Sequence, residues 1–118
     1  MAIINKLIEA IENATNLQMK PFDTDKVEDC LVYQFYTMSD NGAVAQYKLQ
    51  IRIITNSLEK AFSIEKTIKN TMISIGDNIK IEGINSIILN GGGTLKDYEN
   101  DTVQNILYFV ITAKSEVN

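Results

Sequence analysis

Residues 84–114 read INSIILNGGGTLKDYENDTVQNILYFVITAK and include two of the most strand-like segments of the chain. Ile84–Leu89 is rich in isoleucine, and the side chains of Thr102–Lys114 divide into two alternating sets, as those of β-strands do. Between them, Asn90–Asp101 combines three consecutive glycines with spaced acids, which predicts a long flexible loop. Mobile loops on a rigid scaffold often carry binding residues. This hairpin is therefore the first candidate functional element.

Upstream segments show both helical and strand patterns. In Ala2–Thr15 the apolar residues recur at helical spacing, which predicts an amphipathic helix. Asn16–Asp29 is polar, contains the only proline and is predicted to be a connection that could include a short strand. Cys30–Met38 is rich in aromatic and β-branched residues, and Ala43–Thr55 alternates cleanly. The Asn-Gly pair between these two segments predicts a tight hairpin turn with positive φ at both central residues.

A second amphipathic helix is predicted over residues 56–75. Asn56 and Glu59 have the spacing of a capping box, so Asn56 is the expected N-cap. The segment Ile79–Glu82 alternates like the start of a strand, and Gly83 interrupts that pattern in the manner of a bulge. The last hairpin would follow from here.

The order α-β-β-α-β-β over residues 1–118 predicts one α+β domain in two layers, a four-stranded antiparallel sheet with two helices packed on it. The final strands are apolar on both faces, and a sheet of that kind needs cover on both sides. The first helix could cover one patch, and a neighbouring subunit could cover the rest while protecting the edge strands. The expected subunit-contact residues are Ile84, Ile88, Ile106, Tyr108 and Val110.

Composition excludes several function classes. The 118 residues contain no histidine, which removes the usual zinc sites and histidine-based catalysis. The only cysteine, Cys30, is expected to be a small buried residue. A formal charge of −4 without a basic cluster disfavours direct nucleic-acid binding. We expect no membrane partner and no signal peptide, because apolar runs are short and the N-terminus carries an early acid.

The glycine segment fails the common ligand-binding templates. Gly91-Gly92-Gly93 is followed by Thr94-Leu95-Lys96 and a strand, whereas a phosphate-binding loop needs Gly-Lys-Ser/Thr and a helix. The spaced acids Asp97, Glu99 and Asp101 lack the glycine and the glutamate that a calcium loop requires. We therefore expect no cofactor, no metal and no enzymatic activity. A small cytoplasmic ligand-binding domain or enzyme remains the alternative from a different class.

Three segments carry a resemblance to a known family. They are Tyr47–Arg52, which enters the second helix through Asn56-Ser57, Ile87–Asp97, and the aromatic Asn105–Lys114. Together they resemble the tail terminator and tail-completion proteins of long-tailed bacteriophages and related prophages. That group includes small "minor capsid" proteins of phages that infect Gram-positive bacteria.

The resemblance implies a structural virion protein without catalysis. Such proteins form a hexameric ring on the last ring of the tail tube, stop its elongation and join it to head-completion proteins. It also implies assembly in the host cytoplasm, a place at the head–tail junction, and an acidic inner surface past which DNA moves. Another head–tail connector or neck protein is the alternative within this class. The candidate interface loops are Asp40, Asn41, Gly42, Gly91, Gly92, Gly93, Leu95, Asp97, Tyr98, Glu99 and Asp101.

Overall fold

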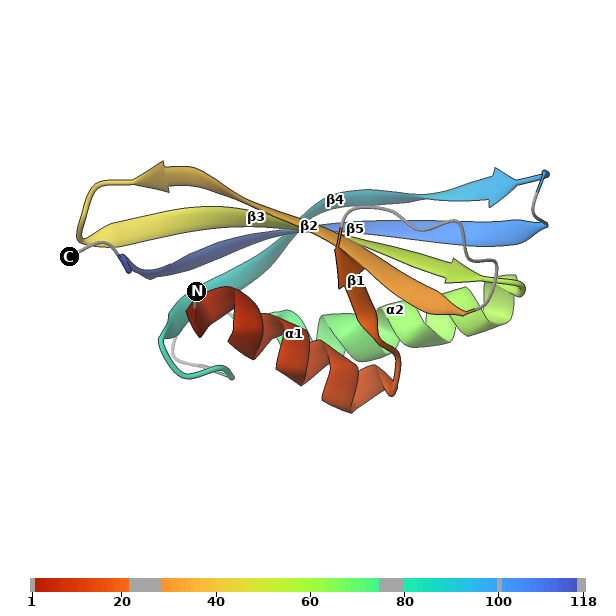
Figure 1. Cartoon of the computed structure of the whole chain (residues 1–118), viewed down its shortest axis with the longest axis horizontal. Coiled ribbons are helices and arrows are strands. Elements are labelled where there is room, and N and C mark those ends of the chain that lie inside the picture. The colour runs from red at the N-terminus through yellow and green to blue at the C-terminus, as the bar shows by residue number, and fades with distance from the viewer. Residues whose placement is uncertain (1, 22–28, 75–79, 100, 117–118) are drawn as a thin grey trace.

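The chain forms two layers, with both helices packed beneath one face of a five-stranded sheet (Figure 1). The computed structural model describes residues 2–21, 29–74, 80–99 and 101–116. Its elements are α1 (Ala2–Thr15), β1 (Met19–Pro21), β2 (Cys30–Asp40), β3 (Val44–Thr55), α2 (Leu58–Met72), β4 (Ile84–Asp97) and β5 (Thr102–Lys114). The strand order is β1-β2-β3-β5-β4, and only the β1–β2 pair is parallel.

The predicted fold class is wrong in its sheet. The element order is α-β-β-β-α-β-β, and the sheet is mixed with five strands, instead of antiparallel with four. The additional strand, β1, has three residues and is too short to show an alternating pattern. Tertiary contacts hold it: the Met19 side chain is buried, and its backbone N–H donates to the Glu12 carboxylate at 2.8 Å. β1 then pairs with the start of β2.

Both predicted helices form, but α2 begins differently from the prediction. Ser57 is the N-cap, and its side chain accepts from the Lys60 backbone N–H at 3.4 Å. The predicted Asn56 cap is therefore wrong. The reason is local. The Thr55 hydroxyl donates to the Ser57 carbonyl at 2.7 Å, and the N-cap therefore lies one residue later than predicted. The last turn of α2 leads to Ser74, which pairs with Ile87 of β4 through two backbone hydrogen bonds of 2.9 Å.

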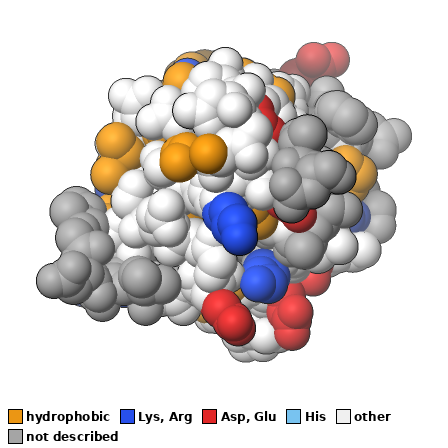
Figure 2. Space-filling view, turned by 90° about the vertical axis from the view of Figure 1, so that its left-hand side faces the viewer, with side chains coloured by type: hydrophobic (Ala, Val, Ile, Leu, Met, Phe, Trp, Pro, Cys, Tyr) orange, Lys and Arg blue, Asp and Glu red, His pale blue; other side chains and the backbone are white. Residues whose placement is uncertain are grey.

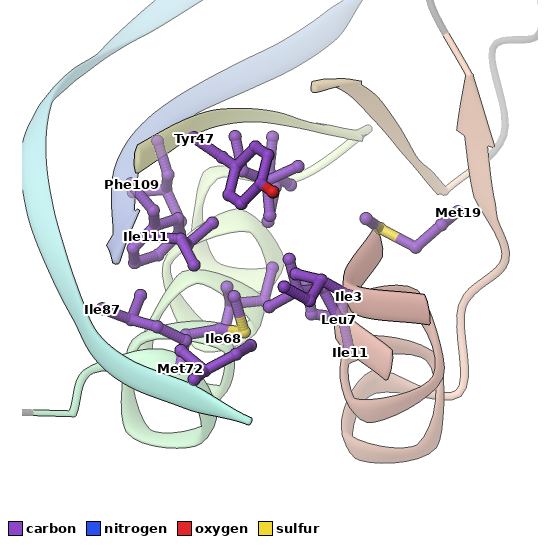
Figure 3. Close-up of a cluster of buried hydrophobic side chains, with 14 of the residues drawn as sticks. Ile3, Leu7, Ile11, Met19, Tyr47, Ile68, Met72, Ile87, Phe109 and Ile111 are labelled. Atoms are coloured by element: carbon purple, nitrogen blue, oxygen red, sulfur yellow. The ribbon is translucent and has the colours of Figure 1, made fainter. Parts of the chain in front are cut away.

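The core lies between the helices and one sheet face, here called the inner face (Figure 3). Ile3, Leu7 and Ile11 reach it from α1, Ile68 and Met72 from α2, and Tyr47, Ile87, Phe109 and Ile111 from the sheet. α1 also contacts α2, so the two helices share this side. The interpretation that α1 could cover the second sheet face is therefore wrong. That second face, the outer face, has no helix over it among the described residues (Figure 1).

The first predicted hairpin is confirmed. β2 and β3 pair from Cys30 with Ile54 to Asp40 with Ala45, across a turn of three residues. Only Gly42 has positive φ there, at 87°, so the expected turn with two positive φ values is wrong. Hydrogen bonds to two side chains close this longer turn. Asp40 accepts from the Gly42 N–H at 2.9 Å, and Asn41 accepts from the Val44 N–H at 2.8 Å.

The predicted loop in the second hairpin is also wrong. β4 continues through the glycines to Asp97, paired with β5, so the hairpin is a long two-stranded arm with a short turn. The register shifts between Leu89 and Gly92, which marks a bulge, and Gly91 has a φ of 106° there. A Cβ on Gly92 would lie 2.5 Å from the Ile106 carbonyl oxygen. These glycines therefore permit a bulge and a close strand approach.

Candidate functional site

The candidate interface residues lie on two hairpins at opposite ends of an elongated molecule of 45 × 25 × 23 Å (Figure 1). Asp40, Asn41 and Gly42 are all exposed at the β2–β3 turn. Figure 2 looks onto this end of the molecule. Apolar side chains form small separate groups there, and charged side chains of both signs gather on the helix side. Hydrogen bonds to the side chains of Asp40 and Asn41 close the turn at this tip.

The other candidate loop residues lie along the end of the β4–β5 arm. Gly91, Gly92, Gly93 and Leu95 are exposed on β4. Lys96 and Asp97 end β4, and together with Tyr98, Glu99 and Asp101 they make up the region here called the acidic tip. Lys96 Nζ donates to Asp101 Oδ1 at 2.8 Å. This hydrogen bond, with the lysine charge, holds the pKa of the Asp101 carboxyl below its ordinary value. Tyr98 is 87% exposed, so the acidic tip presents an aromatic ring to solvent.

The candidate subunit-contact residues divide between the two sheet faces. Ile84 is 2% exposed and belongs to the core. Ile88, Ile106, Tyr108 and Val110 lie on the outer face, as the strand register requires: Val110 pairs with Ile88 and Lys48, and Ile106 pairs with Arg52. Ile88 is 43% exposed, whereas Val110 is buried by its neighbours. The structure therefore brings four of the five together and places the fifth elsewhere.

The outer face also carries cations that sequence reasoning did not single out as a group. Its rows across the strands include Tyr36–Lys48–Val110–Ile88, and Val44 opposite Lys114. Lys48 Nζ lies 5.0 Å from the centroid of the Tyr108 ring, within the range of a cation–π contact. The alternation of β3 places Lys48 on the polar face, but only the register of four strands shows which neighbours surround it.

A second small cluster lies on the outer face, toward the start of β2. Cys30, Val32 and Ile54 are buried there together. The expectation that Cys30 is a small buried residue is confirmed.

Parts of both sheet edges have no strand partner among the described residues. β4 is the edge strand at one side, where Ile87 pairs with Ser74, and at the other side β1 covers only Leu31–Tyr33 of β2. The distal part of β2 therefore has no strand partner on that side among the described residues. Unpaired strand edges are sites where another chain can add.

A shallow depression of about 320 Å³ lies between α1 and residues 80–82. Lys6, Glu9, Lys80 and Glu82 line it, and Lys6 Nζ donates to the Glu82 carbonyl at 3.1 Å. Within the described ranges, no three or more Cys, Asp or Glu side chains are grouped so that they could hold a metal ion. The depression therefore carries side-chain charges of both signs at an open surface.

No helix in the described part of the chain is both long enough and apolar enough to span a membrane.

Comparison with known proteins finds similarity in structure. No family model matches the sequence, and no curated protein matches it. A chain in the solved structure of the virion of a native gene transfer agent particle has a similar fold. The TM-score is 0.61 with 14% identical residues, over 92% of this chain and 84% of that chain. At this identity the similarity shows a shared fold.

Proposed function

We propose that this chain is a structural virion protein that caps the end of a phage-type tail tube as a ring and joins the tail to the head connector. The observation that carries the proposal is the shared fold over 92% of the chain with a component of a native gene transfer agent virion. The independent resemblance of three sequence segments to tail terminator proteins points to the same class.

The surfaces of the chain fit a role in assembly. Ile88, Ile106, Tyr108 and Val110 lie on the outer face, which has no helix over it among the described residues. A neighbouring subunit would cover their apolar surface, which favours association. The edge of β4 beyond the Ser74–Ile87 pair and the distal edge of β2 lie on opposite sides of one sheet. Contacts between two different surfaces of identical subunits generate rings when the rotation closes.

The Asp40–Gly42 turn fits an axial contact of such a ring. It lies at one end of the long molecular axis, and the acidic tip lies at the other end. In a ring, the Asp40–Gly42 turn can contact the tail tube or the head-completion protein.

Light scattering over a concentration series, with negative-stain imaging, tests the proposal. We expect six-fold rings, either from the chain alone or at the ends of tail tubes assembled from the tube protein of the same particle. A control sample of tubes without the chain should show continued elongation. A chain that stays monomeric and leaves tube length unchanged would refute the proposal. Rings that bind only the head connector would instead identify this chain as a neck protein.

A further inference from the structure

We propose that the acidic tip of one copy docks on the outer face of the next copy, where Lys48 and Lys114 receive it. This inference rests on the proposed ring and goes beyond it by naming the two surfaces that meet. The occupant of the outer face is thus a second copy of this chain, and the attraction between them is mainly electrostatic.

The receiving surface is cationic in a chain whose formal charge is −4. Three basic residues, Lys48, Arg52 and Lys114, lie on the outer face of the strands. Apart from Asp97 at the end of β4, the described strand residues of this face include no Asp or Glu. An isolated sheet face with this charge would attract a negative partner and repel a positive one.

Apolar and aromatic surface surrounds these cations. Tyr36 is 48% exposed beside Lys48, and Val44 is 43% exposed opposite Lys114. Lys48 is itself held over the Tyr108 ring. The receiving surface therefore offers positive charge together with exposed apolar and aromatic contact area, a combination that suits an acidic segment with an exposed ring.

The acidic tip has the complementary composition. Residues 96–101 contain three acids and one lysine, and Tyr98 projects from among them. The Glu99 N–H donates to the Asp97 carboxylate at 3.1 Å, and Lys96 binds Asp101. Because these contacts form the turn internally, little conformational freedom would be lost on docking.

The positions of the two surfaces favour contact between copies. Lys48 and Lys114 lie toward the β2–β3 end of the sheet, and the acidic tip ends the arm at the opposite end. One chain cannot bring the two together, because both belong to the same continuous sheet. Successive copies can, in a head-to-tail arrangement that closes into a ring.

Charge-reversed variants test the docking. The face variant Lys48→Glu/Lys114→Glu makes the receiving surface acidic. The tip variant Glu99→Lys/Asp101→Asn changes the formal charge of residues 96–101 from −2 to +1, and asparagine suits the positive φ of residue 101, which is 52°. Each variant alone should associate at least about tenfold more weakly than the wild type, and raising the salt concentration should weaken the wild type too.

Mixing the two variants provides the decisive measurement. In an alternating ring, the positive tip meets the negative face, and the unchanged tip meets the unchanged face. An equimolar mixture should therefore recover ring assembly in rings with an even number of subunits, which a misfolded variant could not do. Lys66→Glu, an exposed reversal on α2, is the control and should assemble like the wild type.

The outcomes separate this inference from the proposed function. Rings that form equally well from both variants would overturn the docking and leave the ring role in place. Variants that fail alone and also fail when mixed would likewise overturn it. A wild-type chain that never forms rings, alone or on tail tubes, would overturn both.

Discussion

The rings of Phe35 on β2 and Tyr47 on β3 stack with their centroids 5.0 Å apart and an interplanar angle of 21°. Tyr47 is 2% exposed, so its phenol is removed from water near the end of the sheet that carries the β2–β3 turn. Burial raises the pKa of Tyr47 above its ordinary value, and the negative charges of Glu116 and Asp40 raise it further. Because Tyr47 belongs to this stacked pair, a titratable phenol is part of the packing of the first hairpin.

The raised pKa of Tyr47 predicts that the folded chain loses stability at alkaline pH. Above the ordinary tyrosine pKa of about 10, the unfolded chain releases the Tyr47 proton while the folded chain retains it. The unfolded state then binds fewer protons, so the free energy of unfolding falls as pH rises toward the raised folded pKa. Below about pH 10 the contribution of Tyr47 is fully present and constant.

Urea unfolding between pH 8 and 11, for the wild type and Tyr47→Phe, measures this effect. The variant keeps the ring but has no proton to release, so its free energy of unfolding should decline less over the same interval. Equal slopes for the two proteins would contradict the assignment. Ultraviolet titration of the phenol provides a direct check, since the wild-type curve should contain a late component that the variant lacks.

Gly92 and Gly93 form a matched pair that tests the arm. In Gly92→Ala, the new Cβ would lie 2.5 Å from the Ile106 carbonyl oxygen, so the arm must distort. We expect a cost of about 1–3 kcal/mol in the free energy of unfolding. In Gly93→Ala nothing lies within 4 Å of the Cβ, and the change should stay within about 0.5 kcal/mol. Similar values for both variants, from urea melts, would mean that this segment is a loose loop after all.

Leu49 and Phe109 test the inner face. The two residues pair across β3 and β5, and both are fully buried. Truncation of either to alanine leaves a cavity and should cost about 2–5 kcal/mol. Val44→Ala, on the same strand but 43% exposed, is the control and should stay within about 0.5 kcal/mol. A near-zero cost for Leu49→Ala in denaturant melts would mean that the faces are assigned backwards.

The Asn105 amide is a buried polar group between β5 and α2. Its Nδ2 donates to Glu65 Oε1 on α2 at 3.5 Å, and Glu65 also pairs with Lys69 at 3.3 Å. Asn105 is fully buried, and its Oδ1 has no hydrogen-bond partner among the described residues. In Glu65→Ala the amide loses this acceptor, and we expect a loss of about 1–3 kcal/mol.

A double-mutant cycle isolates this contact. In the Asn105→Leu background, Glu65→Ala should cost much less, because no buried amide remains to be left unpaired. Glu59→Ala, an exposed acid in the first turn of the same helix, is the control and should cost less than about 1 kcal/mol in both backgrounds. Equal costs of Glu65→Ala in both backgrounds, measured by chemical denaturation, would show that Glu65 acts independently of Asn105.

Sequence patterns predicted the parts of the fold that local periodicity governs. The α1 span, the β2–β3 hairpin and the inner face of β3 follow from side-chain spacing alone. The candidate residues at the β2–β3 turn followed from the Asn-Gly signal. In each of these, a single element carries enough alternation or helical spacing to identify itself.

The predictions of other features failed because contacts with neighbouring elements decide those features. The glycines at 91–93 have the composition of a loop, yet pairing with β5 makes them strand, and the close approach to Ile106 uses their missing side chains. The three-residue β1 exists because Met19 is buried and Glu12 binds its backbone. Short or glycine-rich segments have little propensity of their own, so tertiary contacts override it.

The sequence by itself determined which strands are apolar on two faces. It therefore predicted that apolar surface is left over once the core of this chain is filled. Only the tertiary structure decided which surface that is. It placed both helices on the inner face, gathered Lys48 and Lys114 on the outer face, and set the acidic tip at the far end of the arm. Hydrophobic spacing acts along one element, whereas the meeting of charges from separate strands depends on register, which the packed sheet fixes.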